Sequence, residues 1–107
     1  MSKYFKSNEE NMSVAFLDVL DRAREIAGIP FIINSAYRSP DHPESIKNPT
    51  SSHIKGLAVD IKVTDSRTRS IILTALIAAG LTRIGIADRF IHVDMDFEKS
   101  QNVIWTY

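Results

Sequence analysis

Two segments of the chain carry apolar residues at the spacing of an amphipathic helix. Over residues 8–27 apolar side chains recur at steps of three and four, and charged side chains occupy the opposite side. Residues 66–79 repeat the pattern, with Asp65 or Ser66 as the candidate N-cap, and a glycine directly follows each segment. The pattern predicts two helices that each bury one face.

Five shorter segments are rich in β-branched and aromatic residues and are bounded by turn residues, which predicts strands. They are FIINSAY at 31–37, LAVDIKV at 57–63, TRIGIA at 82–87, FIHVDMD at 90–96 and VIWTY at 103–107. Residues 39–52 hold three of the four prolines, so we expect a loop without regular structure there. A loop of that length in a small domain is often functional.

This order of elements predicts an α+β fold. We expect a small, mainly antiparallel sheet with the helices packed on one face, which leaves the other face open for a site. The length of 107 residues, with 44% hydrophobic side chains, predicts that residues 1–107 form a single domain.

Composition narrows the classes of function. Thirteen basic residues balance thirteen acidic ones, so no overall charge favours nucleic acid or an anionic membrane surface. No apolar run approaches the roughly 18–20 residues of a membrane span, and the first residues lack the pattern of a secretory signal. Because cysteine is absent, a metal would be held by nitrogen and oxygen ligands.

Polar residues with metal-binding chemistry lie in two of the predicted strands. Side chains alternate across a strand, so Asp60 and His92 both lie on the face that their aliphatic neighbours avoid. His53 lies seven positions before Asp60, in a turn that Gly56 allows to be tight. If the two strands are close in the sheet, these three side chains converge.

Two imidazoles, one carboxylate and a water molecule form a typical catalytic zinc site, because three protein ligands leave a fourth position open. Zinc lowers the pKa of its bound water to about 7, which supplies a nucleophile for hydrolysis of an amide. A non-haem iron oxygenase also uses two histidines and a carboxylate, and His92 with Asp94 has its His-x-Asp form. That class needs a further downstream histidine, and none follows Asp94.

The segment SSHIKGLAVD at 51–60 resembles the Ser-x-His-x-x-Gly-x-Ala-x-Asp motif of the zinc D-Ala-D-Ala carboxypeptidase family of peptidoglycan peptidases, which shares its metal-site plan with the hedgehog domain. FIHVD is similar to the second metal segment of that family, and SAYRSPDHP to the segment before the motif. The resemblance implies that Zn²⁺ is bound by His53, Asp60 and His92. It also implies that Arg38 stabilises the substrate carbonyl oxygen.

The general base is where the chain departs from the family. Many relatives have an acidic residue three positions before the last histidine ligand, but this chain has Arg89 there. Asp94 and Asp88 are the candidates, and strand alternation favours Asp94 because it shares a face with His92. The departure at Arg89 leaves a non-catalytic zinc or peptide-binding module open as the alternative.

Other residues receive lesser roles. The motif position of Ser51 suggests that it orients the site, and Tyr37 and Phe90 are candidates for substrate binding. We expect His42 in a surface turn, and Asp96 and Glu98 on the solvated surface. Trp105 and Tyr107 could line a peptide groove, although aromatic residues in strands more often serve packing.

The resemblance implies a zinc metallopeptidase that uses a metal-bound water to hydrolyse amide bonds in peptidoglycan stem peptides or crosslinks, as a carboxypeptidase or an endopeptidase. We expect a monomer of bacterial or phage origin, made in the cytoplasm without a signal peptide. It would act on the cell wall after release or export. The residues alone support only metal-assisted hydrolysis.

Overall fold

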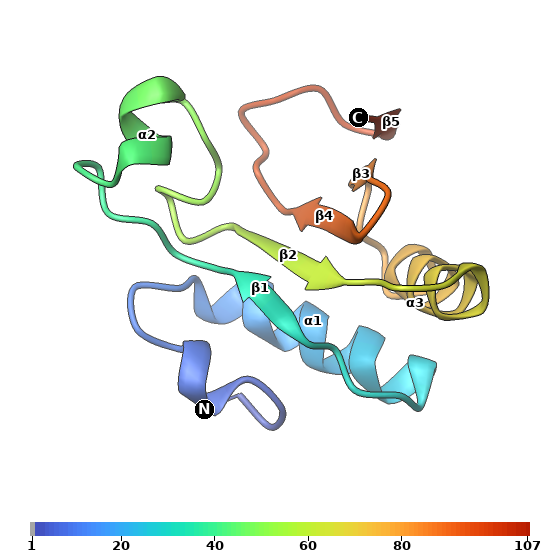
Figure 1. Ribbon diagram of the computed structural model, residues 1–107. Coiled ribbons are helices and arrows are strands. Elements are labelled where there is room, and N and C mark those ends of the chain that lie inside the picture. The colour runs from blue at the N-terminus through green and yellow to red at the C-terminus, as the bar shows by residue number, and fades with distance from the viewer. Residues whose placement is uncertain (1) are drawn as a thin grey trace.

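A computed structural model describes residues 2–107 of the chain (Figure 1). In chain order its elements are η1 (Lys6–Asn8), α1 (Val14–Ala27), β1 (Ile33–Ser35), α2 (Pro43–Lys47), β2 (Ala58–Lys62), α3 (Ser66–Ala78), β3 (Arg83–Ile86), β4 (Phe90–Asp94) and β5 (Val103–Thr106). The predicted α+β fold is confirmed.

The five strands form one sheet in the order β1-β2-β4-β3-β5. The pairs β1–β2, β2–β4 and β3–β4 are antiparallel, as predicted for most of the sheet. The pair β3–β5 is parallel, so the sheet is mixed. This strand order places β2 and β4, which carry the candidate ligands, side by side near the centre.

The helices α1 and α3 pack against each other on one side of the sheet. Their apolar residues join Val59 and Ile61 of β2 and Ile91 and Val93 of β4 in one buried core. In Figure 1, α1 lies below the sheet while α2 lies above it. The polar face of β2 and β4 is therefore turned away from the core. Within residues 2–107, no helix has the length and apolar character needed to span a membrane.

Local capping explains where the long helices begin. The helix α1 begins at Val14 rather than near residue 8, because the Ser13 side chain accepts a hydrogen bond from the Phe16 backbone N–H. Asp65 caps α3 in the same way through the Thr68 backbone N–H, so the prediction of this start is confirmed.

The expectation of an irregular segment at 39–52 is wrong in part. The segment contains the short helix α2, whose first turn has Pro43, a residue well suited to that position. His42 is exposed, as expected, and its Nδ1 accepts a hydrogen bond from the Glu44 backbone N–H. The predicted strand 31–37 is also shorter than expected and reduces to β1.

Candidate metal centre

The register of the sheet aligns one residue from each of the five strands in a single row. Ser35 of β1 lies opposite Asp60 of β2, and Asp60 lies opposite His92 of β4. His92 in turn lies opposite Gly85 of β3, whose parallel partner on β5 is Trp105. Residues directly opposite one another in a sheet share a face. The register thus brings Asp60 and His92 together on the face away from the core.

A tight turn brings His53 to the same place. Gly56 has a φ of +69°, and a Cβ on it would lie 2.1 Å from the carbonyl oxygen of Asn11, so the turn requires glycine. The Ser51 hydroxyl accepts a hydrogen bond from the His53 backbone N–H, and the His53 carbonyl accepts one from the Arg38 backbone N–H. These contacts fix the backbone of His53 beside β2.

The three side chains are close enough to share one ion. Candidate ligand atoms of His53, Asp60 and His92 all lie within 4.8 Å of one another. His53 Nε2 lies 3.3 Å from Asp60 Oδ1, and His92 Nδ1 lies 3.0 Å from the same oxygen. The residues implied by the motif therefore form a cluster that could hold a metal.

The chemistry of the donor atoms fits zinc. Zinc takes imidazole nitrogen and carboxylate oxygen as ligands, and three protein ligands are typical of its catalytic sites. His53 Nδ1 lies 2.8 Å from the Ala36 carbonyl oxygen. Because a carbonyl only accepts, Nδ1 carries the proton and Nε2 keeps a free electron pair toward Asp60. Histidine ligands commonly have such a partner on the other ring nitrogen.

The protonation of the cluster follows from these contacts. Burial raises the pKa of the Asp60 carboxyl, but the neighbouring imidazoles of His53 and His92 lower it by more and hold it well below its usual range. Burial lowers the pKa of His92, while its hydrogen bonds to Asp60 and Asp94 raise it by more, so the net shift is upward. Asp60 is thus ionised at neutral pH, as a metal ligand must be.

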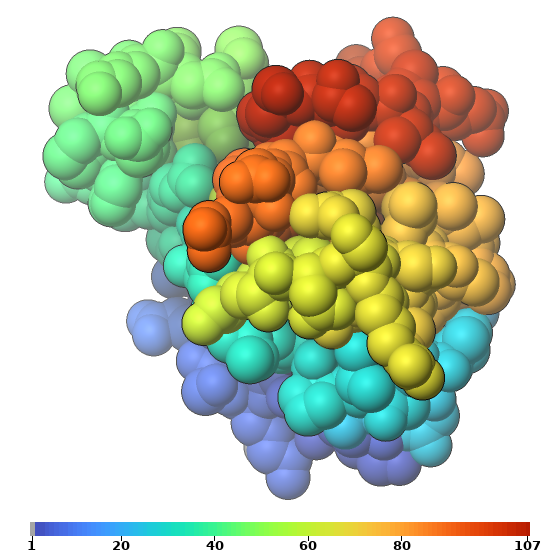
Figure 2. Space-filling view, turned by 45° about the vertical axis from the view of Figure 1, so that its right-hand side comes forward, coloured from blue at the N-terminus to red at the C-terminus, as the bar shows by residue number. Residues whose placement is uncertain are grey.

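A cleft of about 240 Å³ opens over the cluster. Its walls come from the segment around α2, from the sheet and from the end of the chain, and they are formed by Arg38, Asn48, Ser51, His53, Asp60, Phe90, His92 and Tyr107. Figure 2 shows the α2 segment (green) and the C-terminal segment (red) projecting side by side at the top of the molecule. The cluster is therefore accessible to a ligand from this side.

Arg38 lies at the edge of this cleft. Its Nε donates a hydrogen bond to the Ser35 hydroxyl over 3.1 Å, and its Nη2 lies 3.5 Å from Asp60 Oδ2. Its side chain is 22% exposed, so the guanidinium is partly open to the cleft. Arg38 thus places a fixed positive charge beside the candidate metal position.

The two candidates for the general base lie elsewhere. Asp94 is 2% exposed, and its carboxylate contacts His92 and Arg83 rather than the cleft. Asp88 lies exposed in the turn between β3 and β4, where its backbone carbonyl accepts a hydrogen bond from Arg69. Among the cleft-lining residues in the described range 2–107, Asp60 is the only acidic one.

The structure brings only some of the other predicted residues to the site. Ser51 and Phe90 line the cleft, and the Phe90 ring lies 5.3 Å from that of Tyr107. Tyr37 does not line it; this residue borders a different pocket together with the N-terminal segment. Tyr107, which the sequence offered as a residue that could line a peptide groove, does line the cleft.

The expectation that Asp96 lies on the solvated surface is wrong. Asp96 is 1% exposed and accepts hydrogen bonds from the Ser52 hydroxyl at 2.8 Å and from Lys55 Nζ at 3.0 Å. It therefore ties the end of β4 to the turn that carries His53. Glu98 is exposed, as expected.

The sequence did not reveal Arg83 as a neighbour of the site, and it left open whether Trp105 lines a groove or serves packing. Arg83 pairs with Asp94 over 2.7 Å, and the Trp105 ring lies 5.4 Å from that of His92. A Cβ on Gly85 would lie 2.5 Å from Trp105 Nε1, so glycine is required for this packing. Only the strand order reveals these neighbours, because Arg83 lies on β3 and Trp105 on β5, and the pattern within each strand does not show that both meet residues of β4.

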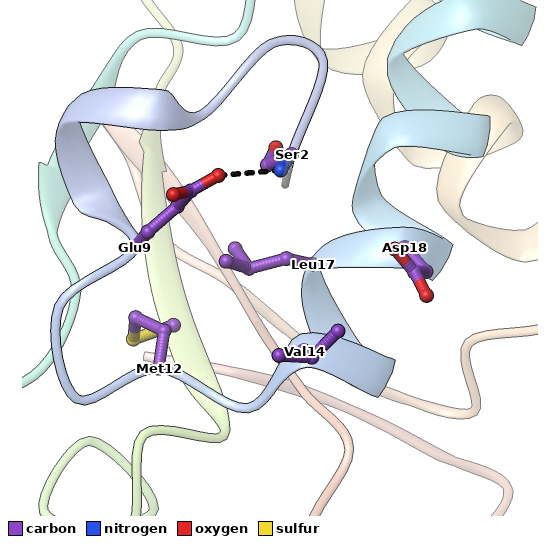
Figure 3. A pocket seen from close by; sticks show the side chains of 6 residues that line it. All are labelled: Ser2, Glu9, Met12, Val14, Leu17 and Asp18. Carbon is purple, nitrogen blue, oxygen red and sulfur yellow. Dashed lines mark hydrogen bonds between the residues drawn. The ribbon is translucent and has the colours of Figure 1, made fainter.

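A second pocket of about 290 Å³ lies between the N-terminal segment and the start of α1 (Figure 3). Its lining consists of Ser2, Glu9, Met12, Val14, Leu17 and Asp18. The Ser2 backbone N–H donates a hydrogen bond to the Glu9 carboxylate at its edge. None of these residues belongs to the metal cluster, so we assign the pocket no part in the site.

Comparison with known families identifies one match. The family model described as Peptidase M15 matches residues 2–94, a range that includes the three candidate ligands and Arg38. No curated protein and no solved structure matches the chain significantly. The matched range ends at Asp94, so β5 with Trp105 lies outside it.

Proposed function

Because the chain belongs to the Peptidase M15 family of zinc D-Ala-D-Ala carboxypeptidase-like enzymes, we propose that it is a zinc-dependent peptidase acting on peptidoglycan. It would hydrolyse amide bonds in the stem peptides or crosslinks of peptidoglycan, either as a carboxypeptidase or as an endopeptidase. The observation that carries this proposal is the convergence of His53, Asp60 and His92 at the floor of an accessible cleft.

Six of the eight residues that line the cleft have a definite task in this proposal. His53, Asp60 and His92 would hold the zinc ion, which when bound polarises a carbonyl group and lowers the pKa of water to about 7. Arg38 would direct its guanidinium at the carbonyl oxygen, where negative charge develops during attack. The Phe90 and Tyr107 rings would support the peptide along one wall.

The experiment is incubation of the zinc-loaded protein with purified muropeptides, followed by mass spectrometry of the products. We expect cleavage that stops on chelation and returns when zinc is added. His53→Ala should abolish both zinc binding and cleavage. His42→Asn is the matched control, since His42 is exposed and lies outside the cluster, and asparagine keeps a side-chain acceptor for the cap of α2. Products that persist after chelation would contradict the zinc mechanism.

A second candidate is a zinc-dependent peptide-binding module without activity. The observation in its favour is that within residues 2–107 the cleft offers no carboxylate besides the candidate ligand Asp60 to accept a proton. Binding of zinc and of muropeptides without any product would support this module. Turnover under the same conditions would exclude it.

A further inference from the structure

The Asp94 carboxylate is fully engaged on the side of His92 remote from Asp60. Asp94 Oδ2 lies 2.7 Å from His92 Nε2, while Oδ1 accepts hydrogen bonds from Arg83 Nε at 2.7 Å and from the Asp96 backbone N–H at 3.1 Å. The side chain is 1% exposed. Asp94 therefore has neither a free oxygen nor an open path to the cleft.

These contacts determine which nitrogen of His92 faces the cluster. Asp94 faces Nε2 and Asp60 faces Nδ1, and an ionised carboxylate only accepts hydrogen bonds, so without an ion His92 can donate from both ring nitrogens. Nδ1 is the ring nitrogen on the side of the cluster, 3.0 Å from Asp60 Oδ1, so an ion bound there would take the place of the Nδ1 proton while Nε2 still donates to Asp94. A carboxylate that accepts from the remote nitrogen of a histidine ligand fixes its tautomer and its ring orientation.

The sheet holds this carboxylate in place. In the register, Asp94 lies between Ala58 of β2 and Arg83 of β3, two residues further along β4 than His92 and on the same face. The Arg83 guanidinium also lies 5.0 Å from the centre of the Trp105 ring, which packs beside His92. Arg83 thus contacts both Asp94 and Trp105, and these two residues in turn hold the imidazole ring of His92.

We propose that Asp94 is a positioning residue that orients His92 for zinc through Nδ1, and not the general base that strand alternation suggested. This inference rests on the proposed function, because it concerns the same metal centre. It also explains why the chain places an Arg–Asp pair beside a candidate ligand although neither residue of the pair lines the cleft.

The first test measures zinc affinity by competition with a chelator. In Asp94→Asn the amide can turn its NH₂ group toward Nε2, which would move the proton to Nδ1 and block the ligand atom. We expect zinc affinity to fall by about 10- to 100-fold, as for other partners of histidine ligands. Asp21→Asn is the control, since Asp21 accepts hydrogen bonds from Ser2, Lys3 and Tyr4 away from the site.

The second test needs no variant, so it stands even if Asp94→Asn fails to fold. In long-range ¹H–¹⁵N spectra of the zinc-loaded wild-type protein, we expect His92 Nε2 to be protonated and Nδ1 to be bound to metal. Metal bound through Nε2 would overturn the proposal. So would unchanged zinc affinity with lost turnover in Asp94→Asn, which is the behaviour of a general base.

These outcomes separate the inference from the function on which it rests. If the wild-type protein binds no zinc, the proposed function fails and the positioning role fails with it. If it binds zinc and cleaves muropeptides, but Asp94→Asn binds zinc as tightly as wild type, only the positioning role is overturned.

Discussion

At the scale of single residues, the site is built from charges that the sheet would otherwise not tolerate. A buried carboxylate is costly unless it is paired or coordinated. Asp60 satisfies this requirement with His53, His92 and Arg38. Each of these partners comes from a different segment of the chain, so the charge of Asp60 holds those segments at one point.

Arg38 provides the first prediction at this scale. Replacing Arg38 with alanine removes the positive charge beside the proposed position of the substrate carbonyl, so kcat for muropeptide cleavage should fall by about 100- to 1000-fold. Zinc affinity should stay within a few-fold of wild type, because Arg38 is not a candidate ligand. Steady-state kinetics and chelator competition would measure the two effects.

The control for this variant is Arg67→Ala, which removes an exposed arginine from α3 on the far side of the sheet. Its kcat should equal that of wild type. If Arg38→Ala also retained full turnover, Arg38 would have no part in stabilising the developing charge.

How far single residues can be predicted depends on whether their partners are close in sequence. Strand alternation placed Asp60 and His92 on the polar face, and the motif added His53. Alternation could not show that Asp96 is buried, because its partners Ser52 and Lys55 lie more than 40 positions away. A charged residue after a strand end looks exposed until the packing is known.

At the scale of elements, the N-cap of α3 gives a test that is independent of the site. The Asp65 carboxylate accepts hydrogen bonds from the Thr68 backbone N–H at 2.8 Å and from the Thr68 hydroxyl at 3.0 Å. Asp65→Ala should lower the free energy of unfolding by about 0.5–2 kcal/mol, the usual contribution of such a cap. Chemical denaturation followed by circular dichroism would measure it.

Asp65→Asn keeps an acceptor at the cap, so it should cost clearly less than the alanine variant. Zinc affinity should be unchanged in both, because α3 packs on the opposite side of the sheet from the cluster. An equal loss in the two variants would show that the cap hydrogen bond does not stabilise the helix.

Elements with strong periodicity were predictable and short ones were not. The helices α1 and α3 and the strands β2 and β4 follow from their apolar patterns. The helix α2 spans only residues 43–47, too few for periodicity to appear, and it depends on capping by His42. The strand β1 is limited to Ile33–Ser35 because its pairing with β2 is irregular between those residues.

At the scale of the whole molecule, the strand order determines which side chains meet at the candidate metal centre. The hydrophobic pattern within single strands does not reveal that order. Inserting β4 between β2 and β3 places His92 against Asp60 on one side and Gly85 on the other. The parallel addition of β5 then brings Trp105 into the row. Such pairings between distant segments depend on the packing of all strands at once, so alternation within single strands cannot reveal them.

The acid stability of the molecule provides the last prediction. Burial raises the pKa of Asp96, but hydrogen bonds from Ser52 and Lys55 lower it more, so its net shift is downward. A carboxyl with a lowered folded-state pKa stabilises the fold above its unfolded value of about 3.9, and this contribution is lost as the pH falls toward the folded-state value.

Asp96→Asn in the metal-free protein should therefore be less stable than wild type at pH 7, by about 1–3 kcal/mol. The deficit should shrink between about pH 5 and pH 3, because wild type loses the same ionised contacts there. Urea denaturation at pH 7, 5 and 3 would measure it. Glu98→Gln is the control, since the Glu98 side chain is 84% exposed and should contribute little at any pH. A deficit of constant size from pH 7 to pH 3 would mean that the ionised form of Asp96 does not stabilise the connection between the end of β4 and the His53 turn.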